Sequence, residues 1–184
     1  MKSKAVLTMI YGLAKALSFF QNSTKFTDDY KLLETLGEGA FGVVGKWENL
    51  ETGAIKAVKM LSKSKIKKNS LSDIVREIEI VKDLDHPNIV KMYESYEDSK
   101  YLYIVTELIQ GGELFDELIR RKRFSEEDCA WIIKQVLEAL SYWHANNLVH
   151  KDIKPENILL DKNELKALIK LQKSQLISFR RCQL

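Results

Sequence analysis

Residues 150–157 read HKDIKPEN and combine side chains that suit one kind of chemistry, the transfer of a phosphoryl group to a hydroxyl. An enzyme of this kind mainly positions the acceptor and neutralises charge on the phosphoryl oxygens. Asp152 can orient the hydroxyl and accept its proton, and Lys154 can reach the transferred group as a point charge. Asn157 offers a side-chain oxygen to a magnesium ion. The structural alternative is a charged turn between a helix and a strand.

A glycine-rich segment, GEGAFG at residues 37–42, has the spacing G-x-G-x-x-G. Glycines at this spacing let backbone amides approach phosphate oxygens where a Cβ would collide. The same spacing opens the helix of a dinucleotide-binding fold. Here predicted strands over 30–36 and 43–47 flank the glycines, and a turn at Thr52-Gly53 follows. This context favours a phosphate-binding hairpin over a dinucleotide-binding helix.

The next predicted strand, 54–61, carries Val58 and Lys59 on opposite faces. A lysine on a buried strand needs an anionic partner. The candidates are nucleotide phosphates and a glutamate of the following helix, whose apolar stripe is Ile74, Ile78, Val81 and Leu84. Glu77 is the favoured partner. Glu79 remains the alternative, because the sequence does not define the rotation of the helix.

A second helix is predicted from Ser125 to about Asn146. Ser125 is a good N-cap, and three acidic residues follow it at the positive end of the helix dipole. Apolar residues then recur at helical spacing, namely Cys129, Ile132, Ile133, Val136, Leu137 and Leu140. We interpret this repeat as core, and Cys129 as a packing residue.

The composition describes a globular chain. Of the 184 residues, 45% are hydrophobic and 30% are charged, which excludes a disordered chain. The net charge of +3 gives no support for nucleic-acid binding. The two cysteines are far apart and lack metal-ligand spacing, so we expect a reducing, cytoplasmic location. Residues 1–29 are expected to form an amphipathic helix and a linker. Docking on protein is favoured over membrane contact or secretion, and no transmembrane helix is expected.

The ordered motifs make the chain resemble a eukaryotic protein kinase domain, closest to the calcium/calmodulin-dependent group of serine/threonine kinases. They are GEGAFGVV, AVK, REIEIVKDLDHPNIV, ELIQGGELFD and HKDIKPENILL. The resemblance implies an α+β, protein-kinase-like fold over residues 30–171. A five-stranded antiparallel small lobe with one helix is expected at about 30–106, a hinge at 107–112, and an incomplete helical large lobe at 113–171. ATP, with Mg²⁺, is expected between the lobes.

The resemblance also implies residue roles. Asp152 would be the catalytic aspartate, Lys154 a phosphate contact, and Asn157 a magnesium ligand. The implied ATP-binding residues are Leu36, Gly37, Glu38, Gly39, Ala40, Phe41, Gly42, Val44, Ala57, Lys59, Glu77, Thr106, Glu107, Ile109, Glu113 and Leu159. For Val44, Ala57 and Leu159, a plain core role is the alternative.

Protein substrates follow from the same resemblance. Glu113 and Glu156 match positions that meet arginines before the phosphorylated residue, so an acceptor with Arg three residues upstream is implied. His150 would brace the catalytic segment. Lys151 replaces the usual arginine and lacks the planar fork that binds a phosphorylated loop.

The chain departs from the family pattern after residues 167–171, which read ALIKL. Lys173 falls where the family has its metal-binding aspartate, and a cation there would repel magnesium. Residues 172–184 have no family counterpart. Three hypotheses follow: a fragment of a genuine kinase, which we favour; a nucleotide-binding pseudokinase or regulatory fragment; or an unstable product that exposes Ile133 and Leu137.

Overall fold

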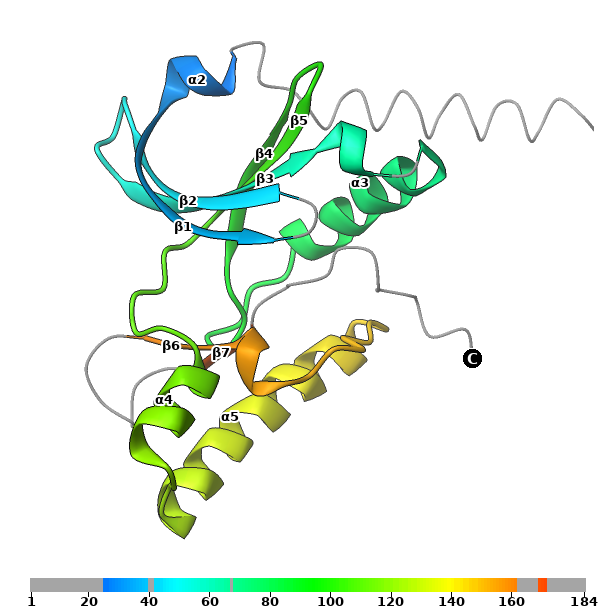
Figure 1. The fold of residues 1–184 in the computed structure, drawn as a ribbon. Coiled ribbons are helices and arrows are strands. Elements are labelled where there is room, and N and C mark those ends of the chain that lie inside the picture. Colours follow the sequence, from blue (N-terminus) through cyan, green and yellow to red (C-terminus); the bar gives the residue numbers. More distant parts are fainter. Residues whose placement is uncertain (1–24, 40–41, 67, 162–168, 172–184) are drawn as a thin grey trace, which may run out of the picture. The chain divides into compact units, whose positions relative to one another are not determined.

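The computed structural model describes residues 25–39, 42–66, 68–161 and 169–171 (Figure 1). The chain divides into two compact units, the first comprising Met1–Ile80 and Tyr93–Thr106, and the second Val81–Met92 and Glu107–Leu184. The predicted N-terminal helix and the divergent tail lie outside the described residues, apart from a short helix, α2 (Phe26–Asp29).

The first unit is built on a five-stranded antiparallel sheet with the strand order β1-β2-β3-β5-β4. The strands are β1 (Tyr30–Gly39), β2 (Gly42–Asn49), β3 (Ile55–Ser62), β4 (Met92–Glu97) and β5 (Tyr101–Thr106). A 3-10 turn, η1 (Lys63–Lys65), leads from β3 towards helix α3 (Lys68–Lys82). The predicted apolar stripe is buried, although only Ile74, Ile78 and Val81 belong to α3 and Leu84 follows its end. The expected five-stranded sheet with one helix is therefore confirmed.

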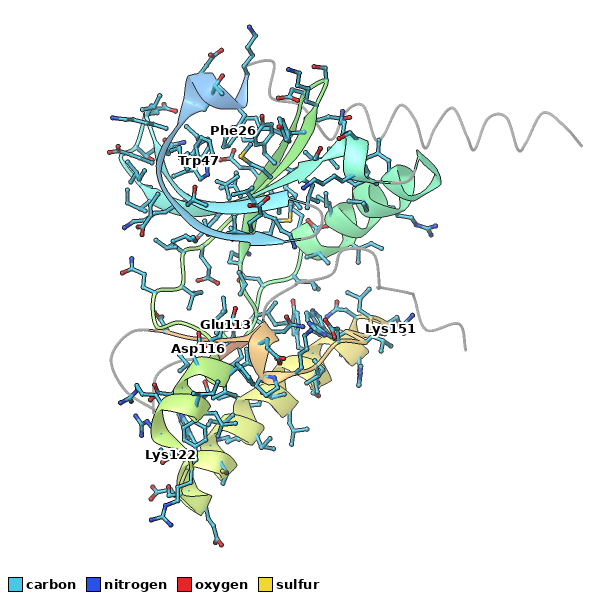
Figure 2. All side chains as sticks on the ribbon, viewed as in Figure 1. Phe26, Trp47, Glu113, Asp116, Lys122 and Lys151 are labelled. Carbon is cyan, nitrogen blue, oxygen red and sulfur yellow. The ribbon has the colours of Figure 1, made fainter. Side chains whose placement is uncertain are left out.

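Phe26 of α2 anchors an aromatic cluster on one face of this sheet (Figure 2). Its ring stacks on Tyr103 at 4.2 Å between centroids and on Tyr30 at 5.1 Å. Trp47 and Tyr96 meet the Phe26 ring edge-on. Such pairs add about 0.5–1.5 kcal/mol to the burial of each ring. The cluster therefore fixes the start of β1 against β2, β4 and β5.

Carboxylates close the polar edge of this cluster. The Tyr30 hydroxyl donates to the Glu94 carboxylate, and the Tyr96 hydroxyl contacts Glu94 Oε2 at 3.1 Å and Asp29 Oδ2 at 3.2 Å. Burial, and then the nearby Glu94 carboxylate, raise the pKa of both tyrosines. Both phenols therefore stay protonated at neutral pH and act as hydrogen-bond donors.

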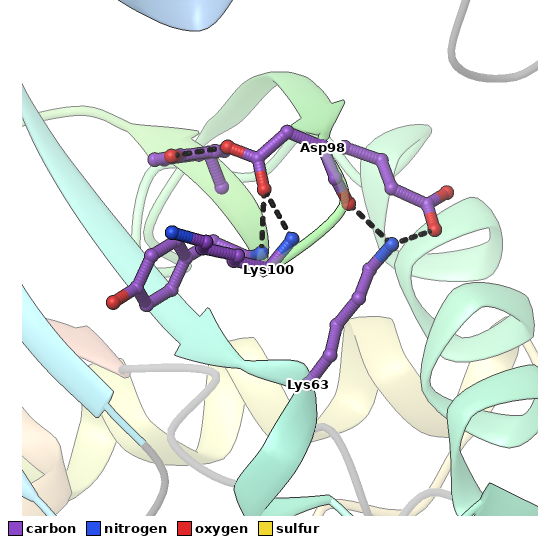
Figure 3. A network of polar contacts seen from close by, with 6 residues as sticks. Lys63, Asp98 and Lys100 are labelled. Carbon is purple, nitrogen blue, oxygen red and sulfur yellow. Dashed lines mark hydrogen bonds and ion pairs between the residues drawn. The ribbon is translucent and has the colours of Figure 1, made fainter.

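The turn between β4 and β5 is held by a polar network (Figure 3). Lys63 Nζ donates to the Glu97 carboxylate and to the carbonyl oxygen of Asp98. The Asp98 carboxylate accepts from the backbone amides of Lys100 and Tyr101. Burial acts to raise the pKa of Asp98, but these amides and the Tyr103 hydroxyl outweigh it and lower that pKa. The ionised Asp98 thus locks the turn.

The second unit contains two helices and a short hairpin. Its elements are α4 (Leu114–Arg121), α5 (Glu126–Ala145), η2 (Pro155–Asn157), β6 (Ile158–Leu160) and β7 (Ile169–Leu171). Ser125 caps α5 by accepting a hydrogen bond from the Asp128 amide at 3.1 Å, as predicted. The segment before β4 is fastened to α5 by a buried bond of 2.8 Å from Asn88 Nδ2 to Gln135 Oε1.

The interpretation of Cys129 as a packing residue is wrong. Ile132 and Val136 are buried, but Cys129 is an exposed free thiol. Cys129, Ile133 and Leu137 are four residues apart and share the outer side of α5. Ile133 and Leu137 are 54% and 58% exposed, as one of the hypotheses expected. The apolar repeat spans two sides of the helix, and only one of them is covered.

None of the helices in the described ranges is long and apolar enough to cross a membrane.

Replacing Phe26 with Ala should destabilise the first unit by about 3–5 kcal/mol, because the change removes a buried ring that contacts four aromatic side chains. The measurement is the free energy of unfolding by denaturant, followed through tryptophan fluorescence, to which Trp47 of this cluster contributes. Leu50→Ala is the control, since Leu50 is 54% exposed and should change stability by less than about 0.5 kcal/mol. Equal effects of the two changes would contradict the anchoring role of Phe26.

Candidate active site

The segment after α5 begins with a buried histidine. His150 stacks on Trp143, with 4.5 Å between ring centroids and 25° between planes. Both side chains are buried. His150 Nδ1 accepts a hydrogen bond of 3.2 Å from the Asp152 amide. The ring therefore connects the packed helix to the backbone of Asp152, which fits the expected bracing role.

Lys151 lies between these two residues in a left-handed conformation, with φ of 62° (Figure 2). This conformation costs a residue other than glycine roughly 1–2 kcal/mol. The turn at Lys151 places the Asp152 amide within hydrogen-bonding distance of the His150 ring. Strain of this kind persists only where the surroundings enforce it, and it is concentrated at functional sites. The Lys151 side chain itself is exposed.

The two predicted catalytic residues, Asp152 and Lys154, and the predicted metal ligand Asn157 come together. Asn157 Nδ2 donates to the carbonyl oxygen and to Oδ2 of Asp152, both at 2.8 Å. Lys154 Nζ lies 3.8 Å from the same Oδ2. Pro155 starts η2, in which the Asn157 amide donates to the Lys154 carbonyl at 2.9 Å. The short helical turn thus brings residues five apart in sequence into direct contact.

This arrangement has defined chemical capacities. Asp152 is half-buried and its carboxylate is oriented by Asn157, which suits a group that accepts a proton. Asn157 uses its amide nitrogen for Asp152, so the carbonyl oxygen of that side chain is the atom suited to a metal. Within the described ranges, no group of three or more His, Cys, Asp or Glu side chains could hold a metal ion. A magnesium ion here would share its shell with phosphate oxygens.

The segment predicted as a hinge is fixed by backbone bonds. The Glu107 amide donates to the Lys91 carbonyl at 3.0 Å, so the group that Glu107 would offer to a nucleotide is its carbonyl. The Gly111 amide donates to the Leu160 carbonyl at 2.8 Å. A Cβ on Gly111 would lie only 2.2 Å from that oxygen, so the contact requires glycine. Leu159 pairs with Glu113 as an isolated bridge, and Ile109 is half-buried.

Acidic side chains gather near residues 150–157, which we call the catalytic segment. Burial raises the pKa of Glu113, the charges of Asp116 and Glu156 raise it further, and Lys154 opposes them. Glu113 and Asp116 lie at the start of α4 (Figure 2). The sequence pointed to Glu113 and Glu156 but missed Asp116. Its signal was the helical spacing of three residues from Glu113 within GGELFD.

In the first unit, one sheet face gathers four of the predicted ATP-binding residues. Val44 pairs with Lys59 across β2 and β3, and Ala57 pairs with Thr106 across β3 and β5. Directly paired residues point to the same side, opposite to the aromatic cluster. Burial lowers the pKa of Lys59. The Glu77 side chain is outside the described part of the chain, so its pairing with Lys59 stays a prediction.

The glycine segment joins two strands, as the sequence context favoured. Leu36, Gly37, Glu38 and Gly39 end β1, and Gly42 begins β2. Ala40 and Phe41 lie outside the described residues. A Cβ on Gly42 would lie 1.7 Å from the Met60 carbonyl oxygen, whereas one on Gly37 would meet nothing within 4 Å. Close approach of two backbones therefore requires glycine at position 42.

The chain resembles known proteins over most of its length. The family profile of the protein kinase domain matches residues 30–172. Calcium-dependent protein kinase 4 of Plasmodium berghei is 49% identical over 156 residues, which cover 83% of this chain and 30% of that protein. Calcium/calmodulin-dependent protein kinase type II of Caenorhabditis elegans is 40% identical over 149 residues, which cover 81% of this chain and 21% of that protein. The chain thus spans less than a third of these relatives.

Gly42→Ala should lower the stability of the first unit by about 1–3 kcal/mol or more, because the new methyl group would force β2 and β3 apart. Gly37→Ala is the matched control within the same motif and should leave the thermal midpoint nearly unchanged. Differential scanning calorimetry of the two variants makes the comparison. A larger loss for Gly37→Ala would refute this account of the close approach.

Asn157→Ala should loosen the catalytic segment, because it removes both hydrogen bonds to Asp152. At about 1 kcal/mol per bond, amide hydrogen exchange over residues 152–158 should accelerate by roughly tenfold or more. Asn146→Ala is the control, since it also removes a bond from an asparagine Nδ2, to the Tyr142 carbonyl. Unchanged exchange in Asn157→Ala, or equal acceleration in the control, would show that Asn157 does not hold Asp152.

Proposed function

Because the chain belongs to the protein kinase domain family, we propose that it binds ATP with Mg²⁺ and transfers the γ-phosphoryl group to serine or threonine hydroxyls of proteins. The observation that carries this proposal is the contact of Asp152 with Asn157 and the short distance to Lys154. A base, a cation and a metal-ligating amide on one braced segment match what phosphoryl transfer needs.

In this proposal Asp152 orients the acceptor hydroxyl and takes its proton, while the bond between the γ-phosphorus and the ADP oxygen breaks. Lys154 neutralises charge on the phosphoryl oxygens, and the Asn157 side-chain oxygen holds Mg²⁺. Lys59 contacts the α- and β-phosphates with Glu77 as its partner. The lowered pKa of Lys59 supports this role, because a buried ammonium gains most from an anionic ligand.

The remaining sites would bind the rest of the nucleotide. Val44, Ala57 and Leu159 flank the adenine ring, and the backbones of Glu107 and Ile109 bond its edge. Thr106 is proposed to lie beside it, and its hydroxyl contacts the Ala57 carbonyl at 3.4 Å. The glycine segment with Leu36 covers the phosphates, and Glu113 completes the nucleotide contacts.

The proposed protein substrates carry arginine three residues before the acceptor. The support is the acidic cluster of Glu113, Asp116 and Glu156, in which the charges of Asp116 and Glu156 act on Glu113. A guanidinium would relieve their mutual repulsion and form charge-assisted hydrogen bonds. Cytoplasmic location remains part of the proposal, because the exposed free thiol of Cys129 suits a reducing compartment.

The test is phosphorylation of a peptide with Arg three residues before Ser, measured with radiolabelled ATP and Mg²⁺. Asp152→Asn should lower the rate at least about a hundredfold while nucleotide affinity, measured by calorimetry, is retained. Binding of ATP without any transfer would instead support a nucleotide-binding regulatory role. The absence of both binding and transfer would refute the proposal.

Glu113→Gln should weaken binding of the Arg-containing peptide by about tenfold, and should leave stability unchanged or slightly higher. The reason is that the raised pKa of Glu113 marks an ionised carboxylate that the folded state disfavours. Peptide affinity in the unmodified chain should fall as the pH drops through that raised pKa. The variant should lose this part of the pH dependence.

Peptide affinity and thermal midpoint, each measured between pH 4 and 7, separate the two effects. Glu138→Gln is the control, because Glu138 is a surface carboxylate on α5 that pairs with Lys134 at 4.0 Å. It should alter neither property. A stability loss in Glu113→Gln without a change in affinity would show that Glu113 is structural.

A further inference from the structure

A run of four basic residues, Arg120, Arg121, Lys122 and Arg123, ends α4 and leads to Ser125 at the start of α5. All four are exposed, as is Ser125. Residues 122–125 have no regular secondary structure. The segment therefore presents four consecutive cations, then Phe124 and the Ser125 hydroxyl, and its last four residues lack regular structure.

The four basic side chains of this run differ in whether they already pair with an acidic side chain of the protein. Arg120 Nη2 lies 2.6 Å from Glu117 Oε1, and Arg121 Nε binds the same carboxylate. The hydrogen bonds from these two guanidinium groups lower the pKa of Glu117 to about 2. For Lys122 and Arg123, no ion pair with another described residue is present. Two cations, three and two residues before Ser125, are thus open to an external anion.

The backbone supports recognition of this side of Ser125. Lys122, labelled in Figure 2, adopts a left-handed conformation with φ of 67° and forms the C-cap of α4. Ser125 is extended, with φ of −68° and ψ of 161°. Its hydroxyl oxygen accepts the hydrogen bond from the Asp128 amide. Ser125 is also exposed, so its hydroxyl lies at the surface beside the first turn of α5.

We propose that Ser125 is a phosphorylation site for a serine/threonine kinase that recognises basic residues before its acceptor. This inference is independent of the chain's own activity. In the reaction, the Ser125 oxygen forms a bond to the γ-phosphorus of ATP and the bond to ADP breaks. The hydroxyl proton passes to the catalytic base of the modifying kinase. Lys122 and Arg123, three and two residues before Ser125, contact carboxylates of that kinase.

The acidic residues after Ser125 invite a second reading, which the structure disfavours. Glu126, Glu127 and Asp128 would suit a kinase that recognises carboxylates after the acceptor. They belong to the first turn of α5, whereas such a kinase must read them in an extended chain. A kinase that recognises Lys122 and Arg123 disturbs only irregular backbone and the C-terminal end of α4, where fraying costs least.

The test uses the full chain carrying Asp152→Asn, so that its own catalysis does not enter the measurement. The chain is incubated with labelled ATP and Mg²⁺ and with either the catalytic subunit of cAMP-dependent protein kinase or casein kinase 2, as basic-directed and acid-directed probes. The tryptic peptide that contains Ser125, which is 124–134 where Arg123 and Lys134 are intact, is analysed by mass spectrometry, which separates Ser125 from Ser70 and its preceding lysines. We expect incorporation at Ser125 with the basic-directed kinase, and none in Ser125→Ala.

The double variant Lys122→Gln with Arg123→Gln should lower the initial rate at Ser125 about tenfold or more, while Ser125 itself remains. Lys134→Gln removes an exposed cation elsewhere on α5 and should leave the rate unchanged. Circular dichroism verifies that the variants retain their helices. Incorporation only with the acid-directed kinase, a rate unaffected by the double variant, or no incorporation at Ser125 would each overturn the proposal.

Discussion

The stacking of His150 on Trp143 is the contact on which the geometry of the catalytic segment depends. It immobilises a ring whose nitrogen accepts the Asp152 amide hydrogen bond, and this bond needs the left-handed turn at Lys151. Such a turn is unfavourable by itself, so the buried stack must stabilise it. Asn157 then fixes the Asp152 side chain from the other side. The orientation of the Asp152 carboxylate thus rests on the packing of His150 against α5.

Side chains alternate between two faces along the strands of the first unit, so the residues that stabilise the sheet and the proposed ATP-binding residues lie on opposite faces. Val58 and Val105 point into the aromatic cluster, while their neighbours Lys59 and Thr106 point to the opposite face. The residues of the aromatic cluster therefore bury apolar area on one face, and the side chains of the other face can be polar. The alternation also links the two faces, because a one-residue slip of β3 would exchange Lys59 for Val58 on the face that carries the proposed ATP-binding residues.

The features predicted from the sequence were those governed by local spacing. Strand alternation, the capping of α5 by Ser125, and the residues 150–157 all follow from short-range rules. Trp143 was not predicted, because its role depends on a ring that is seven residues away in sequence and meets it only after the chain turns. Cys129 was misjudged because helical periodicity locates an apolar side without showing what covers it. Asp116 was missed although it lies three residues from Glu113, because its effect on Glu113 is electrostatic and belongs to no sequence motif.

Helix α4 and its N-cap carry two glutamates, four residues apart, whose environments shift their pKa values in opposite directions. Glu117 is paired with Arg120 and Arg121, and its lowered pKa means that its ionised form stabilises the fold above its unfolded pKa, an effect lost as the pH falls towards 2. Glu113 has a raised pKa, so ionisation above its unfolded value removes stability instead. Burial and the charges of Asp116 and Glu156 raise this pKa, and Lys154 opposes them only in part. In the proposed function, the arginine of a protein substrate would supply the positive charge that compensates the Glu113 carboxylate.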